Sequence, residues 1–344
     1  MIRKGTREMG IETRILEVSD DASSNVPPDY GVDVKQVSYG DLGDFLATDE
    51  IYIGLDDYHF LERIKGINHE KLLIWVHYFN GASLFFKQYI DWQESGKFRK
   101  LSRRVYRDFF PTPLQLRMLG PYLQGLKKRP VFAQSLWTGL LLNRIYNAGC
   151  KGIVYNPIDP EEFPSGYEPA DRTNVVVFLG GPDDTHLEHT TNFLKEMGPL
   201  LRDLEIHSFG SDTYSQRLAE MSGTEIKHHS RITRRDLFAL EKRSVFTITP
   251  VYGGNFEMVP IESLMNLTPV ISYLQPFMEV TGLTDLVANL QNGNLALKLA
   301  RKWMQKGMGD SLEVMRDRIV SSMNYGKVAK DLVHITESTI PGTS

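Results

Sequence analysis

The residues whose types and spacing best suit chemistry lie in the segment Pro250–Val270. Gly253 and Gly254 follow an expected strand, and adjacent glycines let a backbone approach a ligand closely. Pro260 suits the first turn of a helix, because its missing N–H would be unpaired there in any case. Such a helix would carry Glu262 in its first turn, where free N–H groups favour a phosphate and a carboxylate can accept hydrogen bonds from ribose hydroxyls. The alternative is a carboxylate that only complements the helix dipole.

The elements that position this segment alternate between short apolar runs and helical stretches. Apolar runs bounded by polar segments are typical of strands buried on both faces of a parallel sheet. The expected strands are Glu12–Val18, Val32–Val37, Glu50–Gly54, Leu72–Val76, Pro130–Ala133, Ile153–Tyr155, Asn174–Leu179, Glu205–Phe209, Glu225–His228, Ser244–Thr249 and Pro269–Tyr273. Strands that alternate with helices indicate α/β domains, whose ligands bind at the carboxyl ends of the strands.

The chain of 344 residues is long enough for two domains. Residues 156–172 hold four prolines and five acidic residues, so they can continue neither a sheet nor a long helix and are interpreted as a linker. We therefore predict a first domain over residues 1–155 and a second domain over residues 173–310. A helical tail, residues 311–344, could pack back on the first domain.

Composition and charge exclude several classes of protein. Lys plus Arg number 39 and Asp plus Glu 43, and the net charge of -4 gives no general attraction to nucleic acid or to anionic membranes. The single cysteine, Cys150, cannot form an intrachain disulfide and is interpreted as a turn or packing residue rather than a nucleophile. No apolar run approaches the roughly 18 residues of a membrane span, and the polar start lacks the apolar core of a signal peptide. We expect a cytoplasmic protein, with peripheral contact at the cytoplasmic face of a membrane left open.

Several stretches, in order and at matching spacing, resemble one family. They are Phe132–Ser135 with Trp137 and Thr138, Tyr155–Asp159 with Phe163, Val177–Gly180, and the set Pro250, Phe256, Pro260, Glu262 and Thr268–Val270. Together they resemble the retaining glycosyltransferases of family 4. The resemblance implies the GT-B fold, an α/β arrangement of two Rossmann-like parallel-sheet domains that face each other across a cleft. The acceptor would bind on the side of the first domain, and the nucleotide-sugar donor would bind to the second.

The resemblance also implies an activity and a set of site residues. A sugar would pass from a nucleoside diphosphate sugar to a hydroxyl of a glycan, lipid or small-molecule acceptor, with retention of the anomeric configuration and without a metal or other cofactor. The expected catalytic residues are His77 and Glu257. The expected donor-binding residues are Gly180, Gly181, His186, Gly253, Gly254, Asn255, Phe256, Glu262 and Glu279. The alternatives are a strand-end histidine for His77, a solvated helix start for His186 and a surface loop acid for Glu279.

The sequence also departs from the family pattern. Gly254 stands where the family carries the first glutamate of this motif, and Glu257 is a nearby carboxylate that could replace it. The arginine and lysine that hold the donor phosphates in the family are not visible, so His186 or an arginine of the run Arg231–Arg235 would have to supply the charge. The alternative for that run is a solvated face. Met1–Gly10 matches the end of the helix after the family's first strand, which indicates a fragment or a mis-assigned start.

These departures keep a second interpretation open, a non-catalytic GT-B-fold protein that binds a sugar nucleotide or a partner. A dinucleotide-dependent oxidoreductase is disfavoured, because no G-x-G-x-x-G follows an expected strand. A metal hydrolase is also disfavoured. The pairs His186/His189 and His228/His229 lack a third ligand at suitable spacing, and adjacent side chains in a strand point to opposite faces.

Overall fold

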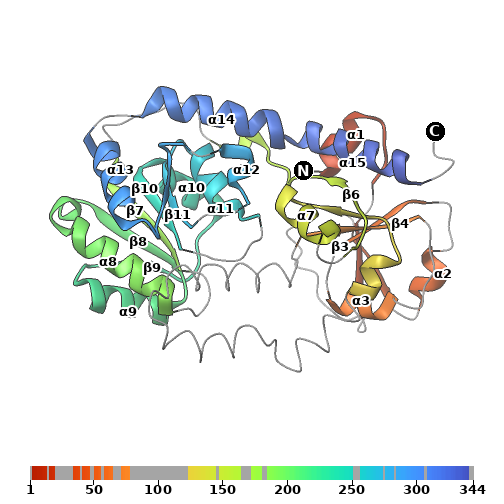
Figure 1. Ribbon diagram of the computed structural model, residues 1–344, viewed down its shortest axis with the longest axis horizontal. Coiled ribbons are helices and arrows are strands. Elements are labelled where there is room, and N and C mark those ends of the chain that lie inside the picture. Colours follow the sequence, from red (N-terminus) through yellow and green to blue (C-terminus); the bar gives the residue numbers. More distant parts are fainter. Residues whose placement is uncertain are drawn as a thin grey trace. The chain divides into compact units, whose positions relative to one another are not determined.

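The computed structural model describes residues 2–13, 15–19, 34–38, 41–46, 50–55, 58–64, 71–77, 123–144, 147–163, 172–179, 184–250, 256–273, 276–282, 284–305 and 308–340. The chain forms two compact units. The first unit contains Met1–Ile158 and Tyr325–Ser344, and the second contains Asp159–Tyr252 and Phe256–Asn324. Each unit is built around parallel strands (Figure 1).

The sheet of the second unit has the strand order of a Rossmann fold. Its described strands are β7 (Asn174–Leu179), β8 (Glu205–Gly210), β9 (Lys227–His229), β10 (Ser244–Thr249), β11 (Val270–Ser272) and β12 (Val287–Asn289). They lie parallel in the order β12-β11-β10-β7-β8-β9. Numbered from β7, and read from β9, this is the order 3-2-1-4-5-6. Every residue of β10 is buried, as expected for a strand covered on both faces.

Helices cover both faces of this sheet. The described helical segments are η2 (Pro160–Glu162), α8 (Asp184–Leu201), α9 (Asp212–Ser222), α10 (Arg234–Lys242), α11 (Met258–Met265), α12 (Met278–Thr281), α13 (Gly293–Gln305) and α14 (Gly309–Met323). Residues of α8, α9 and α13, such as Leu194, Leu218 and Trp303, share one core with the strands. Helices α10 and α11 pack on the opposite face, and α14 packs against α11 and α12 (Figure 1).

Capping residues decide where α9 and α10 begin and end. Ser211 caps the start of α9, and Gly223 ends it at φ 68°, a left-handed conformation that favours glycine. Thr233 accepts a hydrogen bond from the backbone N–H of Asp236, as expected of an N-cap threonine, and its hydroxyl donates one at 2.7 Å to the Asp236 carboxylate. Helix α10 therefore begins at Arg234, shortly after the carboxyl end of β9.

The first unit contains a four-stranded parallel sheet and a separate parallel strand pair. Its described elements are α1 (Ile2–Glu8), β1 (Ile15–Ser19), β2 (Val34–Ser38), α2 (Leu42–Leu46), β3 (Tyr52–Leu55), α3 (Tyr58–Ile64), β4 (Leu72–Val76), β5 (Val131–Ala133), α7 (Leu136–Arg144), β6 (Cys150–Ile153) and α15 (Tyr325–Thr339). The described strands β3, β4, β5 and β6 pair in that order, and β1 pairs with β2.

The last helix, α15, covers one face of the four-stranded sheet. Alternate residues of β4 point to opposite faces, so Ile74 packs in one core and Trp75 in the other. The core that contains Trp75 is completed by α15 residues, among them Leu332. Helix α1 packs against α15, where a Cβ on Gly5 would lie 2.5 Å from the carbonyl oxygen of Tyr325. Only glycine permits this approach, and it brings elements from both ends of the chain together (Figure 1).

Candidate functional site

The carboxyl ends of β7 and β10 mark the candidate site in the second unit. These strands are parallel neighbours, and the helices that follow them, α8 and α11, leave toward opposite faces of the sheet (Figure 1). This arrangement is a topological switch point, where open α/β sheets bind ligands. Five predicted donor-binding residues follow the two strands but lie outside the described residues: Gly180, Gly181, Gly253, Gly254 and Asn255.

Thr249, the last residue of β10, places a buried hydroxyl at the switch point. Thr249 is 2% exposed, and within the described residues its Oγ1 has no hydrogen-bond partner. Its carbonyl oxygen does accept a hydrogen bond from Ser272 Oγ, at 3.1 Å. A buried hydroxyl that makes no hydrogen bond destabilises the fold. A polar ligand at this edge of the sheet could donate to or accept from this hydroxyl, which has no partner among the described residues.

Helix α11 begins two residues before the position expected from the sequence. Its N-cap is Glu257, which has extended backbone and makes no side-chain capping hydrogen bond. Pro260 is the third helical residue and Glu262 the fifth, so the prediction that Glu262 lies in the first turn is wrong. The earlier start is permitted because the first four N–H groups of a helix have no intrahelical partner. A proline at the third position therefore removes no hydrogen bond from the helix. Phe256, buried at 3% exposure, precedes the N-cap.

The two predicted carboxylates at this helix have different surroundings. Burial raises the pKa of the Glu257 carboxyl above its usual range. Burial also raises the pKa of Glu262, while Arg234 lowers it and Glu162 raises it. Glu262 Oε1 lies 2.8 Å from Nη2 of Arg234, and the same nitrogen lies 3.2 Å from Glu162 Oε2. The sequence marks Arg234 only as a member of a basic run, because the pairing depends on α10 and α11 packing side by side.

A buried hydrogen-bond network joins α10 and α11 next to Glu262. Glu241 of α10 is 1% exposed and accepts hydrogen bonds from Ser263 at 2.7 Å and from Asn266 at 2.6 Å, both at the α11 side. Burial, the largest cause, raises the pKa of Glu241 to about 8; Ser263 and Asn266 lower it, Glu262 raises it, and Arg234 lowers it. Sequence reasoning did not identify Glu241, since an isolated glutamate in an amphipathic helix carries no signal of burial.

The other predicted donor-side residues follow neighbouring strands. His186 lies in the first turn of α8, and Glu279 is the second residue of α12, after β11. The sequence did not indicate the contact between His189 Nδ1 and the hydroxyl of Tyr273, which are 2.7 Å apart. Tyr273 is fully buried just beyond β11, so this contact ties α8 to the carboxyl end of a strand on the far side of β10.

In the first unit, His77 follows the carboxyl end of β4, as the sequence predicts. Gln134 donates a hydrogen bond from Nε2 to the carbonyl oxygen of His77, and its Oε1 accepts one from Asn156 Nδ2 at 3.2 Å. The ring of His77 meets that of Trp75 edge to face, with centroids 4.2 Å apart. Burial lowers the pKa of His77 to about 4, so the imidazole is neutral at pH 7. It can exchange hydrogen bonds there but carries no charge.

Other kinds of site receive no support from the described residues. The thiol of Cys150 donates to the carbonyl oxygen of Gly152 at 3.3 Å, and burial raises its pKa, which disfavours a thiolate nucleophile. Among the same residues, no group of three or more His, Cys, Asp or Glu side chains is arranged to hold a metal ion. None of the described helices is long and apolar enough to cross a membrane.

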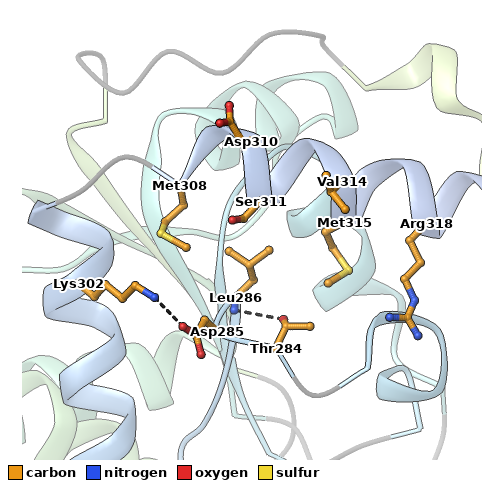
Figure 2. A pocket seen from close by; sticks show the side chains of 10 residues that line it. All are labelled: Thr284, Asp285, Leu286, Lys302, Met308, Asp310, Ser311, Val314, Met315 and Arg318. Atoms are coloured by element: carbon orange, nitrogen blue, oxygen red, sulfur yellow. Dashed lines mark hydrogen bonds and ion pairs between the residues drawn. The ribbon is translucent and has the colours of Figure 1, made fainter.

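A separate hollow of about 430 Å³ lies in the second unit, away from the candidate site (Figure 2). Its walls are Thr284, Asp285, Leu286, Lys302, Met308, Asp310, Ser311, Val314, Met315 and Arg318. Residues 284–286 precede β12, so the hollow borders the amino end of a strand, whereas ligands of this fold bind at carboxyl ends. Lys302 pairs with Asp285 at 2.5 Å across one side of it. It contains none of the predicted site residues.

Comparisons with known proteins bear on the fold. The sequence matches no known family description, and no curated protein matches it. Solved structures do match. Sucrose-phosphate synthase from Thermosynechococcus elongatus aligns over 98% of this chain and 91% of its own, at 14% identity and a TM-score of 0.60. The α,α-trehalose 6-phosphate synthase from Burkholderia multivorans aligns over 89% of this chain and 75% of its own, at 10% identity and a TM-score of 0.58.

A third similar structure is TarM from S. aureus, solved with fondaparinux, α-GlcNAc-glycerol and UDP. It aligns over 83% of this chain at 12% identity and a TM-score of 0.55, and this chain spans about half of its length, 55%. These structures are GT-B glycosyltransferases. At such identities the likeness shows the fold alone, and it confirms the expected fold class, two Rossmann-like parallel-sheet domains of the GT-B type.

Proposed function

We propose that this chain is a retaining glycosyltransferase of the family 4 kind, which uses a nucleoside diphosphate sugar and needs neither a metal nor another cofactor. The observation that carries the proposal is the carboxylate of Glu262. Its side chain is only 16% exposed, and it lies on the helix that leaves the switch point, with Arg234 at 2.8 Å. A buried carboxylate at such an edge suits the hydroxyl pair of a ribose. The GT-B fold supports the same assignment.

In this proposal the second unit binds the donor. Glu262 accepts hydrogen bonds from the ribose, and the hydroxyl of Thr249 gains a polar partner. The diphosphate lies at the start of α8, near Gly180, Gly181 and His186, because the N-terminus of a helix favours anions. The loop of Gly253, Gly254, Asn255 and Phe256 contacts the sugar, and Glu279 contacts it from the loop after β11.

The resemblance to the retaining enzymes supplies the transfer step of this proposal. The acceptor oxygen forms a bond to the anomeric carbon on the face from which the nucleotide departs. The bond to the diphosphate breaks, its electron pair leaves with the nucleotide, and a diphosphate oxygen takes the acceptor proton. Stabilisation of the departing diphosphate would be the main electrostatic contribution. His77, neutral at pH 7, positions the acceptor hydroxyl rather than removing its proton, and Glu257 faces the charge that develops on the sugar.

The proposal is tested by donor binding. Calorimetry with UDP-glucose, GDP-mannose and ADP-glucose on the full chain should find a donor that binds. Glu262→Gln should weaken that donor by about tenfold to about a hundredfold, the range expected when a charged hydrogen-bond acceptor is lost. Glu313→Gln makes the same chemical change at an exposed position of α14 and should leave the affinity unchanged.

Turnover separates the enzyme from a binding protein of the same fold. The donor that binds should be hydrolysed slowly, or its sugar transferred to an added acceptor, with the product anomer matching the donor by NMR. A folded chain that binds none of the three donors would overturn the proposal. Binding without hydrolysis or transfer would favour the non-catalytic alternative, which the glycine at position 254 keeps open.

A further inference from the structure

The guanidinium of Arg234 is held by three groups from three elements. Its Nη2 lies 2.8 Å from Glu262 of α11 and 3.2 Å from Glu162 of η2. Its centre lies 4.9 Å from the ring of Phe238, one turn further along α10. One cationic group therefore serves two carboxylates, and its position on the aromatic ring limits where it can move.

Contacts of the next residue, Phe163, fix the position of η2, which carries Glu162. The ring of Phe163, the next residue, stacks on Phe238 at 4.6 Å, and its carbonyl oxygen accepts a hydrogen bond from Arg316 of α14 at 3.2 Å. Glu162 is thus held beside Arg234 by packing as well as by charge. The two carboxylates differ in exposure, because the side chain of Glu162 is 41% exposed and that of Glu262 is 16% exposed.

Because of this difference in exposure, the two carboxylates depend to different degrees on the charge of Arg234. Water can solvate Glu162, whereas Glu262 is mostly removed from water and depends on the guanidinium to offset the rise in its pKa that burial causes. Among the described residues, Glu241 is a further titratable neighbour, and its pKa of about 8 leaves it uncharged at pH 7. Arg316 of α14 donates to the carbonyl oxygen of Phe163. Arg234 and Glu162 are therefore the charges that act on Glu262 from α10 and η2.

We propose that Arg234 is a positioning residue that holds the Glu262 carboxylate ready for the donor ribose, and that Glu162 weakens this hold by sharing the same guanidinium nitrogen. The inference rests on the proposed role of Glu262 as the ribose ligand. It assigns a function to two residues that the proposed donor site does not itself include.

The two neighbours should shift donor binding along the pH axis in opposite directions. A carboxylate accepts hydrogen bonds from both ribose hydroxyls, so affinity should fall as the pH decreases through the pKa of Glu262. Without Arg234 that pKa is higher, and the loss of affinity should begin at a higher pH. Without the charge of Glu162 it is lower, and affinity should persist to a lower pH.

The experiment measures donor affinity by calorimetry from pH 5 to pH 8, using whichever of UDP-glucose, GDP-mannose and ADP-glucose binds the wild type. Sugar-linked diphosphates carry a constant charge over this range, so they do not contribute a titration of their own. The midpoint is the pH at which protonation of Glu262 begins to lower the affinity. Arg234→Gln should raise this midpoint by about one pH unit, which corresponds to about tenfold weaker binding at a pH below the wild-type midpoint. Arg234→Lys should recover part of the loss, since an ammonium restores the charge but not the planar fork.

Glu162→Gln should move the midpoint downward, and Arg243→Gln, at the other end of α10, should leave it in place. If Arg234→Gln fails to fold, the midpoints of Arg234→Lys and Glu162→Gln still test the inference. Wild-type binding with the same midpoint in Arg234→Gln and Glu162→Gln would overturn this inference and leave the proposed function intact. A folded wild type that binds no donor would overturn both.

Discussion

Thr249 and Glu262 reach the candidate site from consecutive described elements, and the described residues satisfy their polar atoms differently. The hydroxyl of Thr249 is buried without a partner at the end of β10. Glu262 is mostly buried and shares its one guanidinium with Glu162. A buried hydroxyl without a partner destabilises a protein unless a polar group completes its hydrogen bond. Thr249 therefore supports the proposal of a polar ligand at the carboxyl edge of the second unit.

Thr249→Val tests this interpretation at a single hydroxyl. Because the change removes a buried group that makes no hydrogen bond among the described residues, we expect the free energy of unfolding to rise by about 1 kcal/mol. The affinity for a nucleoside diphosphate sugar should fall in the same variant. Urea denaturation and calorimetry measure the two effects, and Thr213→Val, at an exposed position of α9, is the control. A loss of stability in Thr249→Val would contradict the interpretation.

At the scale of elements, the packing of α10 against α11 positions the candidate site. Arg234 at the start of α10 pairs with Glu262, and Glu241 near its end binds Ser263 and Asn266. The pKa of about 8 means that Glu241 keeps its proton at neutral pH. Asn266 Oδ1 has no partner among the described residues, and a rotation of that amide would let it accept the proton of Glu241.

Glu241→Gln should therefore change how the stability of the protein depends on pH. The folded pKa of about 8 lies above the ordinary 4.5, so the folded state holds this proton more tightly than the unfolded chain. The contribution of Glu241 is fully present below pH 4.5 and is lost as the pH rises toward 8. Glutamine cannot ionise, so the variant should lack this decrease.

Urea denaturation at pH 5 and pH 8 measures the effect, with Glu220→Gln as an exposed control on α9. Relative to the wild type, Glu241→Gln should gain stability at pH 8 compared with pH 5, by a few kcal/mol at most. An identical pH dependence in wild type and Glu241→Gln would show that Glu241 is ionised in the folded protein.

At the scale of the whole molecule, the chain leaves the first unit after Ile158 and returns to it at Tyr325. The backbone N–H of Tyr325 donates to the carbonyl oxygen of Ile158 at 3.1 Å, so the points of exit and return are adjacent. Helix α15 then completes a core with Trp75 and Phe132 from the sheet. The stability of the first unit therefore depends on residues more than 150 positions away in sequence.

Leu332→Ala should reveal this dependence. Leu332 is 5% exposed in the core beneath α15, and loss of a buried leucine costs about 2–5 kcal/mol. Hydrogen exchange should show lower protection in β4 and β5, while β7 and β10 of the second unit keep theirs. Leu140→Ala makes the same change at a residue of α7 that is 46% exposed, and it should have a clearly smaller effect. Equal loss of protection in both units would refute separate stability of the two units.

Much of the architecture was predictable because it depends on local patterns. Short apolar runs such as Leu72–Val76 and Ser244–Thr249 are strands, and the capping residue Thr233 starts a helix where it was expected. The start of α11 was less predictable, because proline is tolerated at several positions of a first turn. The assignments of His77, Glu257, Glu262 and Glu279 as functional residues remain predictions.

The sequence by itself determined the alternation of strands and helices, because periodicity and capping act along the chain. Its resemblance to a known family implied the GT-B fold class, which the structure confirms. The segment Pro250–Val270 remains a predicted donor site. Tertiary structure decided the partners of the site residues. Three features depend on which elements pack together: the pairing of Arg234 with Glu162 and Glu262, the burial of Glu241, and the Thr249 hydroxyl that has no partner among the described residues. Hydrogen bonds, desolvation and charge pairing act across distances that sequence separation does not reveal, and here they set the chemical state of the candidate site.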